Sequence, residues 1–303
     1  MVAGNNSKIL YESKIKQLKL RNIKLDGSVS VESIVETLRI ANMSESTIKT
    51  YLCAIIWQIK KTDALSNKYE DFIQSLSNKI SEINTYLQKQ VNKGVLSKKQ
   101  EANYLTWNKV IDVHNILKSL HNNSQKDFSN YLLVSLYVLF PPRRIMDYSQ
   151  LHVLFDFDDS FIKENPTDDF DNKNYYVYDK NLLIFNNWKN KTVFNKDSNE
   201  VKYKQQHFTI SSQLNDLLKS YIDKFNIKAS IFGVSDKAII KRLQTIFNTH
   251  AGKSTSADAL RQSYITQQDK LGNIKNMQAK LELAEKMGHS VALQILYQKE
   301  EIQ

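Results

Sequence analysis

The sequence predicts a mainly α-helical protein of two domains, the second an α+β domain whose helices enclose a small antiparallel sheet. Glycine and proline are scarce, with 7 Gly and 3 Pro in 303 residues, which disfavours turn-rich all-β architectures. Apolar residues recur at helical spacing over most of the chain, whereas aromatic and β-branched runs gather between residues 175 and 210. The chain is twice the ~150 residues expected of one domain, so two domains are predicted.

The first part of the chain is expected to form a basic arm and then a helical domain. Residues 1–27 mix basic and apolar positions and end at an Asp-Gly turn signal, and we assign them to the arm. The helical domain covers residues 28–95. Ser44 is a good helix N-cap there, and it is followed at helical spacing by Ile48, Tyr51, Leu52, Ile55 and Ile59. A second helix is predicted over 66–91, and the polar residues 96–103 are assigned to a linker.

Residues 104–303 are expected to form the second domain. One helix is predicted from Trp107 to Leu120 and a more apolar one over 128–140, which the pair Pro141-Pro142 stops. Strand-like runs follow at 175–178, 182–185 and 203–210. From residue 211 onward the pattern is helical again, in four or five segments with breaks near Asn226, Gly252, Gly272 and Gly288.

The charge distribution points to a polyanionic partner. Lysine and arginine number 42 against 32 acids, which gives a formal net charge of +10. Residues 8–24 contain six basic residues and one acid, whereas residues 156–171 contain seven acids and one lysine. The acidic segment is therefore expected to face away from a nucleic acid. On charge alone, a solvated acidic loop on a mildly basic protein explains the pattern equally well.

The cysteine and histidine usage bounds the chemistry and the compartment. A lone cysteine, Cys53, excludes an intramolecular disulfide and a multi-thiolate metal site, and the six histidines have no zinc-binding spacing. We therefore expect no metal and no cofactor. No apolar run approaches the ~18 residues of a membrane span, and no secretion signal is apparent, so an intracellular, reducing compartment without membrane attachment is expected.

Four local patterns contain residues suited to phosphate chemistry. They are Pro142-Arg143-Arg144-Ile145-Met146-Asp147, Asn187-Trp188-Lys189-Asn190-Lys191-Thr192, Asp258-Ala259-Leu260-Arg261, and Met287-Gly288-His289-Ser290 with Tyr297 eight residues after the histidine. Each has an ordinary explanation when it is taken alone. Arg144 suits a helix end, Leu-Arg pairs are common, His289 suits a helix start, and Tyr297 suits a core position.

The order Arg, Lys, Arg, His, Tyr resembles that of the tyrosine recombinases, the phage-integrase superfamily. Met287-Gly288-His289-Ser290 through Tyr297 is similar to the closing Leu-Gly-His-Ser…Tyr motif of that family. Arg144 with Asp147 matches the first Arg-x-x-Glu/Asp box, and Leu260-Arg261 matches the second. Residues 44–51 are similar to the start of a DNA-clamping helix. The resemblance covers about residues 28–300 and is strongest to members from large eukaryotic DNA viruses and their satellite elements, which implies integration of a viral genome in the host cytoplasm or nucleus.

The resemblance implies a site-specific DNA recombinase or integrase that works through a 3′-phosphotyrosyl intermediate without metal or ATP. Arg144 and Arg261 would clamp the phosphate, since arginine stays charged and donates paired hydrogen bonds. His289 would be a further donor and Tyr297 the nucleophile. The general acid would be Lys189, with Lys191 as the alternative.

The implied partners are double-stranded DNA and three further copies of the chain, as a tetramer on the DNA. Arg143, Lys49 and Lys253 are candidate contacts to DNA phosphates, and for the two lysines a solvated surface position is an equal alternative.

Asp258 departs from the family pattern, which has histidine at that place. A carboxylate there is not a cationic donor at neutral pH; it would hydrogen-bond the hydroxyl of Tyr297 or orient Arg261. Two other functions therefore stay open. One is a type IB topoisomerase that relaxes supercoils with the same chemistry, and the other is a catalytically inactive DNA-binding or architectural protein, which Asp258 favours.

Overall fold

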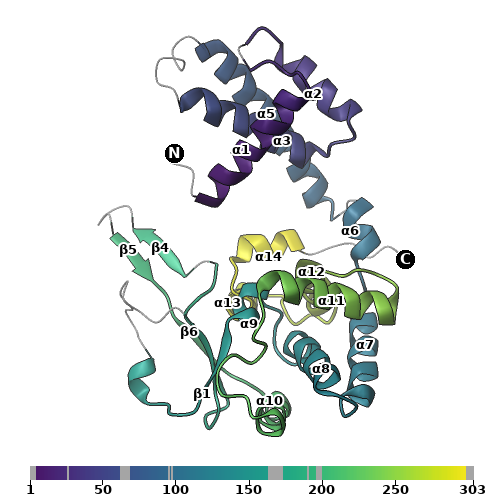
Figure 1. The fold of residues 1–303 in the computed structure, drawn as a ribbon, viewed down its shortest axis with the longest axis vertical. Coiled ribbons are helices and arrows are strands. Elements are labelled where there is room, and N and C mark those ends of the chain that lie inside the picture. The colour runs from purple at the N-terminus through teal and green to yellow at the C-terminus, as the bar shows by residue number, and fades with distance from the viewer. Residues whose placement is uncertain are drawn as a thin grey trace. The chain divides into compact units, whose positions relative to one another are not determined.

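The computed structural model is mainly helical and carries a small β-sheet, as the sequence predicts (Figure 1). It describes residues 5–25, 27–61, 69–94, 96, 98–162, 173–189, 191–195 and 200–297. The chain divides into two compact units, Met1–Lys93 and Gly94–Gln303. Among the described residues, no helix combines the length and apolar character that crossing a bilayer requires.

The first unit is built from helices around one apolar core. They are α1 (Asn5–Leu20), α2 (Val31–Ile40), α3 (Glu45–Lys60) and α5 (Glu70–Asn92). Ser44 caps α3, as predicted, because its hydroxyl accepts from the backbone N–H of Thr47 at 3.3 Å. The predicted apolar positions of α3 point inward, and Ile48, Leu52 and Ile55 are fully buried.

The expected basic arm is wrong, because residues 5–20 form helix α1 of the first unit. Ile15 and Leu18 are buried in its core, and the hydroxyl of Tyr51 on α3 donates to Gln17. Lys14 lies over the ring of Tyr51, 4.6 Å from its centroid. Ile15 and Leu18 thus anchor the segment to the core, whereas Lys8, Lys16 and Lys19 are exposed.

The expected linker is also corrected, because residues 98–103 form a short helix, α6 (Lys98–Asn103), within the second unit. The hydroxyl of Thr255 donates to the carbonyl of Asn103 at 2.9 Å. Lys253 donates to the carbonyls of Glu101 and Tyr104 at 3.2 and 3.0 Å. These bonds satisfy carbonyls at the end of α6 that have no partner inside the helix.

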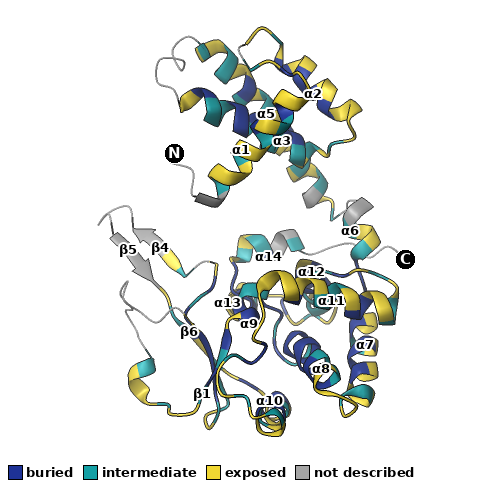
Figure 2. Ribbon diagram, viewed as in Figure 1, coloured by how far each residue is buried: buried dark blue, intermediate teal, exposed yellow. Residues whose placement is uncertain are grey.

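The second unit packs its helices around a core centred on α8 and the sheet, where Figure 2 shows the buried residues gathered. Before the sheet come α7 (Trp107–Leu120), α8 (Gln125–Val138) and α9 (Ile145–Ser149). After it come α10 (Ser212–Phe225), α11 (Asp236–Ala251), α12 (Ala257–Lys270), α13 (Met277–Lys286) and α14 (Val291–Tyr297). The breaks between these last helices fall at the four predicted positions, and Asn226 and Gly252 cap α10 and α11 with left-handed backbone.

The main sheet is mixed rather than antiparallel as expected. Its order is β1-β2-β3-β6, with β1 (Leu151–Leu154) parallel to β2 (Asn174–Val177) and the remaining pairs antiparallel. The other members are β3 (Leu182–Phe185) and β6 (Gln206–Thr209). The strand β1 was not predicted. A 3₁₀ turn, η2 (Asp159–Phe161), follows it inside the acidic segment, of which residues 163–171 lie outside the described part.

The run predicted as one strand over 203–210 is divided between two sheets. β5 (Glu200–Tyr203) pairs with β4 (Thr192–Asn195) in a separate two-stranded ribbon, and β6 begins three residues after β5 ends. The bend at Lys204-Gln205 lets the indole N–H of Trp188 donate to the Lys204 carbonyl at 3.1 Å. This arrangement brings Gln206 to the start of β6, at the edge of the candidate site.

Candidate active site

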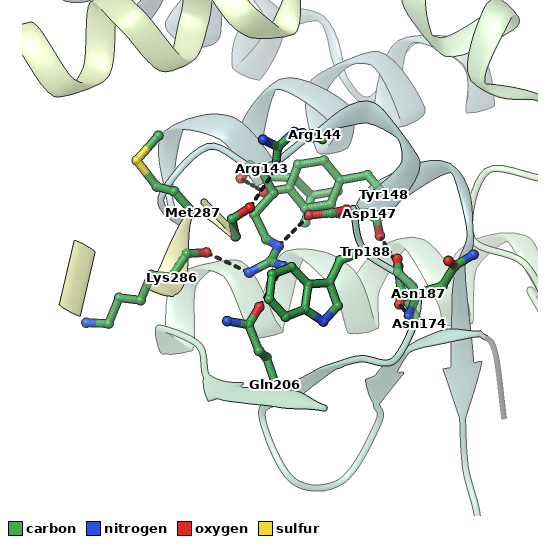
Figure 3. Close-up of polar contacts among 12 residues, drawn as sticks. Arg143, Arg144, Asp147, Tyr148, Asn174, Asn187, Trp188, Gln206, Lys286 and Met287 are labelled. Carbon is green, nitrogen blue, oxygen red and sulfur yellow. Dashed lines mark hydrogen bonds and ion pairs between the residues drawn. The ribbon is translucent and has the colours of Figure 1, made fainter. Parts of the chain in front are cut away.

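The two adjacent arginines at the start of α9 point in different directions. Arg144 is the N-cap of α9 with extended backbone, φ −75° and ψ 158°, and side chains alternate in direction along extended backbone. Figure 3 shows the Arg143 side chain running into the fold and that of Arg144 leading away from it. Each arginine therefore reaches a different environment.

Arg143 is fully buried, and each of its guanidinium nitrogens is bonded within the protein. Nε donates to Asp147 at 2.7 Å, Nη1 to the Lys286 carbonyl at 2.8 Å, and Nη2 to Gln206 Oε1 at 2.9 Å. Its Cζ lies 3.8 Å from the ring centroid of Phe185. The predicted DNA contact of Arg143 is therefore wrong, because its side chain is fully buried and all three of its guanidinium nitrogens already bond to other parts of the protein.

Arg144 and Arg261 donate to neighbouring carbonyls of the turn between α13 and α14. Arg144 Nη1 bonds to the Gly288 carbonyl at 2.5 Å, and Arg261 Nη2 bonds to the Met287 carbonyl at 3.3 Å. Arg261 is fully buried on α12, whereas Arg144 is partly exposed. Burial, and then the charge of Arg261, lower the pKa of Arg144. The sequence-predicted arginine pair therefore converges, although the residues come from helices far apart in the chain.

Four successive carbonyls receive side-chain donors, one from each of four residues. Gln206 Nε2 donates to Glu285 at 3.1 Å, and Arg143, Arg261 and Arg144 donate in turn to the carbonyls of Lys286, Met287 and Gly288. We call residues 285–288 the clamped turn. Carbonyls at a helix end lack partners within the helix and attract cations, so the end of α13 is a natural site for the three arginines.

His289 follows the clamped turn directly and is buried, with 7% of its surface exposed. Neither ring nitrogen has a hydrogen-bond partner within the described part of the chain. Burial, with Arg261, Arg144 and Arg143 acting in the same direction, lowers the pKa of His289 to about 3. The imidazole is therefore neutral at pH 7 and keeps one N–H to donate to an incoming group.

Tyr297 is the last residue of α14 and lies against His289, with ring centroids 5.6 Å apart and planes tilted by 36°. Ser290 begins that helix by accepting from the backbone N–H of Leu293 at 3.3 Å. The Tyr297 hydroxyl accepts from Arg261 Nη1 at 3.4 Å. Burial raises the pKa of this phenol, and Arg261 opposes the rise.

Asp258 lies one turn before Arg261 on α12 and is mostly exposed. Its Oδ1 is 3.6 Å from Arg261 Nη1, the nitrogen that also bonds Tyr297. Of the two predicted roles, orientation of Arg261 is the one with a direct contact. A bond to the hydroxyl of Tyr297 stays a prediction.

The two candidate lysines lie in the turn between β3 and β4. Lys189 is exposed, whereas Lys191 is partly buried and donates to Asn187 at 3.4 Å. Burial lowers the pKa of Lys191. Trp188, directly before Lys189, lies 5.9 Å from Cζ of Arg143, so the turn starts beside the arginines. The choice between the lysines stays a prediction, and Asn190 lies outside the described residues.

Asn174 and Gln206 position parts of this site but were not predicted. Asn174 is buried at the start of β2, and its side-chain nitrogen donates to the carbonyls of Asp147 and Asn187 at 3.0 and 2.9 Å (Figure 3). Asn174 thereby connects the turn between β3 and β4, which carries the two lysines, to α9. Neither residue belongs to a recognisable sequence motif, so only the three-dimensional structure identifies them.

The two lysines proposed for DNA contact have protein partners in the structure. Lys49 donates to Asn84 on α5 at 3.1 Å, and Lys253 donates to the carbonyls near the end of α6. Their contacts to DNA stay predictions. Among the described residues, no group of three or more His, Cys, Asp or Glu is arranged to hold a metal ion.

Comparison with known proteins gives limited information. No family model matches the chain, and no curated protein matches it. Among solved structures, the chain is similar to one titled "Crystal structure of XerA recombinase", with a TM-score of 0.41, 13% sequence identity, and coverage of 99% of this chain and 89% of that one. Because this likeness is loose, the functional interpretation depends on the arginines, His289 and Tyr297.

Proposed function

We propose that this protein breaks and rejoins DNA strands, with Tyr297 as the nucleophile. One observation carries the proposal: Arg144, Arg261, His289 and Tyr297, which the sequence spreads over more than 150 positions, meet around one turn. Arginines beside a partly buried tyrosine suit attack on a phosphodiester. They stabilise the negative charge that develops on its oxygens.

In the proposed reaction, Arg144 and Arg261 bind the non-bridging oxygens of the scissile phosphate, and His289 donates a further hydrogen bond. The phenolic oxygen of Tyr297 attacks phosphorus in line and forms a 3′-phosphotyrosyl bond. The bond to the 5′ oxygen breaks, and Lys189 or Lys191 protonates that oxygen as it leaves. Attack by the freed hydroxyl on the phosphotyrosine reverses these steps and rejoins a strand, without ATP or metal.

The phenol must lose its proton for this attack, and its raised pKa keeps the proton bound in the free protein. The positive charge of Arg261 lowers the pKa of Tyr297 and would stabilise the phenolate as it forms. Asp258 shares Nη1 of Arg261 with Tyr297 and is exposed, so it is well placed to accept the proton directly or through water.

The finer biological assignment is a site-specific recombinase or integrase acting on double-stranded DNA as a tetramer, in the manner of viral and satellite elements. The net charge of +10 supports a DNA partner. Strand exchange between two duplexes needs four cleavages, one for each tyrosine of a tetramer. Steep loss of DNA affinity with rising salt is expected, because phosphate contacts dominate such binding.

The test is a search for the covalent intermediate. The protein is incubated with a library of nicked duplexes of randomised sequence, and denatured protein is examined for attached DNA. We expect an adduct that Tyr297→Phe abolishes and that Tyr264→Phe, a change at another partly buried tyrosine, preserves. Adduct without four-way junctions, but with relaxation of supercoiled plasmid, would indicate a topoisomerase. DNA binding without any adduct would indicate an inactive binding protein.

A further inference from the structure

Arg143 has no role in the reaction proposed above, yet it is among the most completely bonded side chains of the second unit. It joins α9, β6 and the end of α13 through bonds to Asp147, Gln206 and the Lys286 carbonyl. A buried arginine is costly to desolvate, and an ion pair with one carboxylate at best offsets that cost. We therefore looked to its contacts for a role besides stability.

Its contacts concentrate on the clamped turn. Besides the bond to Lys286, the guanidinium lies against Gly288: a Cβ at that position would be only 2.7 Å from Nη2 of Arg143. Gln206 is bonded to both Arg143 and the Glu285 carbonyl, so it extends the same support by one residue. Arg143 therefore supports the backbone that leads into His289.

We propose that Arg143, held by Asp147 and Gln206, is a positioning residue that fixes the clamped turn so that His289 and Tyr297 face the phosphate that Arg144 and Arg261 are proposed to bind. The inference rests on the proposed function. This role of Arg143 also explains how Arg144 and Arg261 could give up their hydrogen bonds to the carbonyls and bond to phosphate oxygens instead. Arg143 and Gln206 keep the bonds to Lys286 and Glu285, so the turn stays in place when its other two carbonyls are released.

Two variants separate positioning from simple stability. Arg143→Lys keeps the charge but loses the planar fork that reaches three partners at once. Arg143→Met combined with Asp147→Leu removes both charges, which avoids leaving a buried carboxylate unpaired and preserves stability. If Arg143 only stabilises the fold, the double variant will form the tyrosyl adduct at the wild-type rate.

We expect both variants to form the adduct at least tenfold more slowly at saturating DNA, with DNA affinity within threefold of wild type. A loss confined to DNA affinity, or a double variant of normal rate, would overturn the proposal.

A second readout does not depend on DNA cleavage. The imidazole of His289 is followed by NMR titration, with its resonance assigned through His289→Gln. In Arg143→Lys the turn should loosen and admit water, so that the pKa of His289 rises by more than one unit towards 6.5. His114, buried elsewhere with its pKa lowered to about 4, is the internal reference and should not change.

The two readouts make the failures distinguishable. If wild-type protein forms no adduct but His289 titrates as expected in the variant, the proposed function is wrong and the positioning of the turn stands. If adduct forms but neither the rate nor the His289 titration responds to Arg143→Lys, the positioning role is wrong and the proposed function stands.

Discussion

Nη1 of Arg261 lies 3.4 Å from the hydroxyl oxygen of Tyr297, and Cζ of the same arginine lies 5.2 Å from the centre of the phenol ring. The hydroxyl therefore accepts from a cation that also donates to the Met287 carbonyl. A single guanidinium thus touches the candidate nucleophile and the turn that leads to His289. This contact makes the chemistry of Tyr297 depend on Arg261.

Replacing either clamp arginine should slow cleavage strongly. Arg144→Ala and Arg261→Ala each remove a donor that we propose binds the phosphate, and loss of one such donor typically costs about 100-fold in rate. Single-turnover adduct formation at saturating DNA measures the effect. The matched control is Arg242→Ala, an arginine of α11 bonded to Asn130 at 2.6 Å, which should stay within threefold of wild type. Equal losses in all three variants would refute a specific clamp.

The rate of adduct formation should rise with pH over the neutral range. Burial raises the pKa of Tyr297, so the phenolate is the minor form at pH 7 and grows about tenfold per pH unit below that pKa. Arg261→Gln removes the cation that opposes the shift, so its profile should move to higher pH. A flat profile from pH 6 to 9 would show that deprotonation of Tyr297 does not control the step.

A better leaving group should reveal which lysine protonates the 5′ oxygen. A substrate with sulfur at that 5′ position needs no proton to leave, because a thiolate is a far weaker base than an alkoxide. The catalytic lysine is identified when its alanine variant is slow on ordinary DNA and regains the wild-type rate on the sulfur substrate. We compare Lys189→Ala with Lys191→Ala. Rescue of neither variant would remove both from the mechanism.

Gly288→Ala should reduce activity more than its backbone strain explains. Gly288 has φ +63°, and the new methyl group would meet the guanidinium of Arg143. Gly252→Ala is a matched control, because Gly252 has φ +68° and nothing within 4 Å of the added atom. Backbone strain should lower the free energy of unfolding, measured in urea, by a similar amount in both variants. Only Gly288→Ala should also displace Arg143 and slow cleavage. Identical cleavage rates would contradict the close approach.

Acid should destabilise the protein below about pH 6.5. Burial lowers the pKa of His114 to about 4, and burial with nearby arginines lowers that of His289 to about 3, so unfolding takes up protons between these values and 6.5. Each histidine adds a slope of up to about 1.4 kcal/mol per pH unit to the free energy of unfolding in that window, and stability is greatest above it. Urea unfolding at several pH values checks this, and His114→Gln should flatten the curve.

Local sequence signals predicted the helices well because their caps and breaks are local. Ser44 caps α3, and Asn226 and Gly252 end α10 and α11, as their residue types indicate. The arm was missed because a lysine-rich segment looks solvated, and the burial of Leu18 depends on α3, which is distant in sequence. The strand β1 was missed because its four residues gain their pairing from β2, twenty residues later.

The site shows the same division between local and long-range information. The order of Arg144, Arg261, His289 and Tyr297 was enough to predict that they meet. It did not reveal which of two adjacent arginines is buried, since that depends on the direction of the backbone before α9 and on Phe185 and Gln206 across the fold. Arg143 was consequently assigned to DNA when it belongs to the interior.

The clamped turn limits which sequence changes relatives of this chain can tolerate. Each of its carbonyls is matched to a donor from a different residue, on β6, at the start of α9 or on α12, so the spacing from Glu285 to His289 is fixed residue by residue. Substitutions on the outer face of α13 leave that match intact. An insertion or deletion of a single residue between Lys286 and His289 would displace the Met287 and Gly288 carbonyls from Arg261 and Arg144, and relatives that keep the reaction should share this interval without gaps.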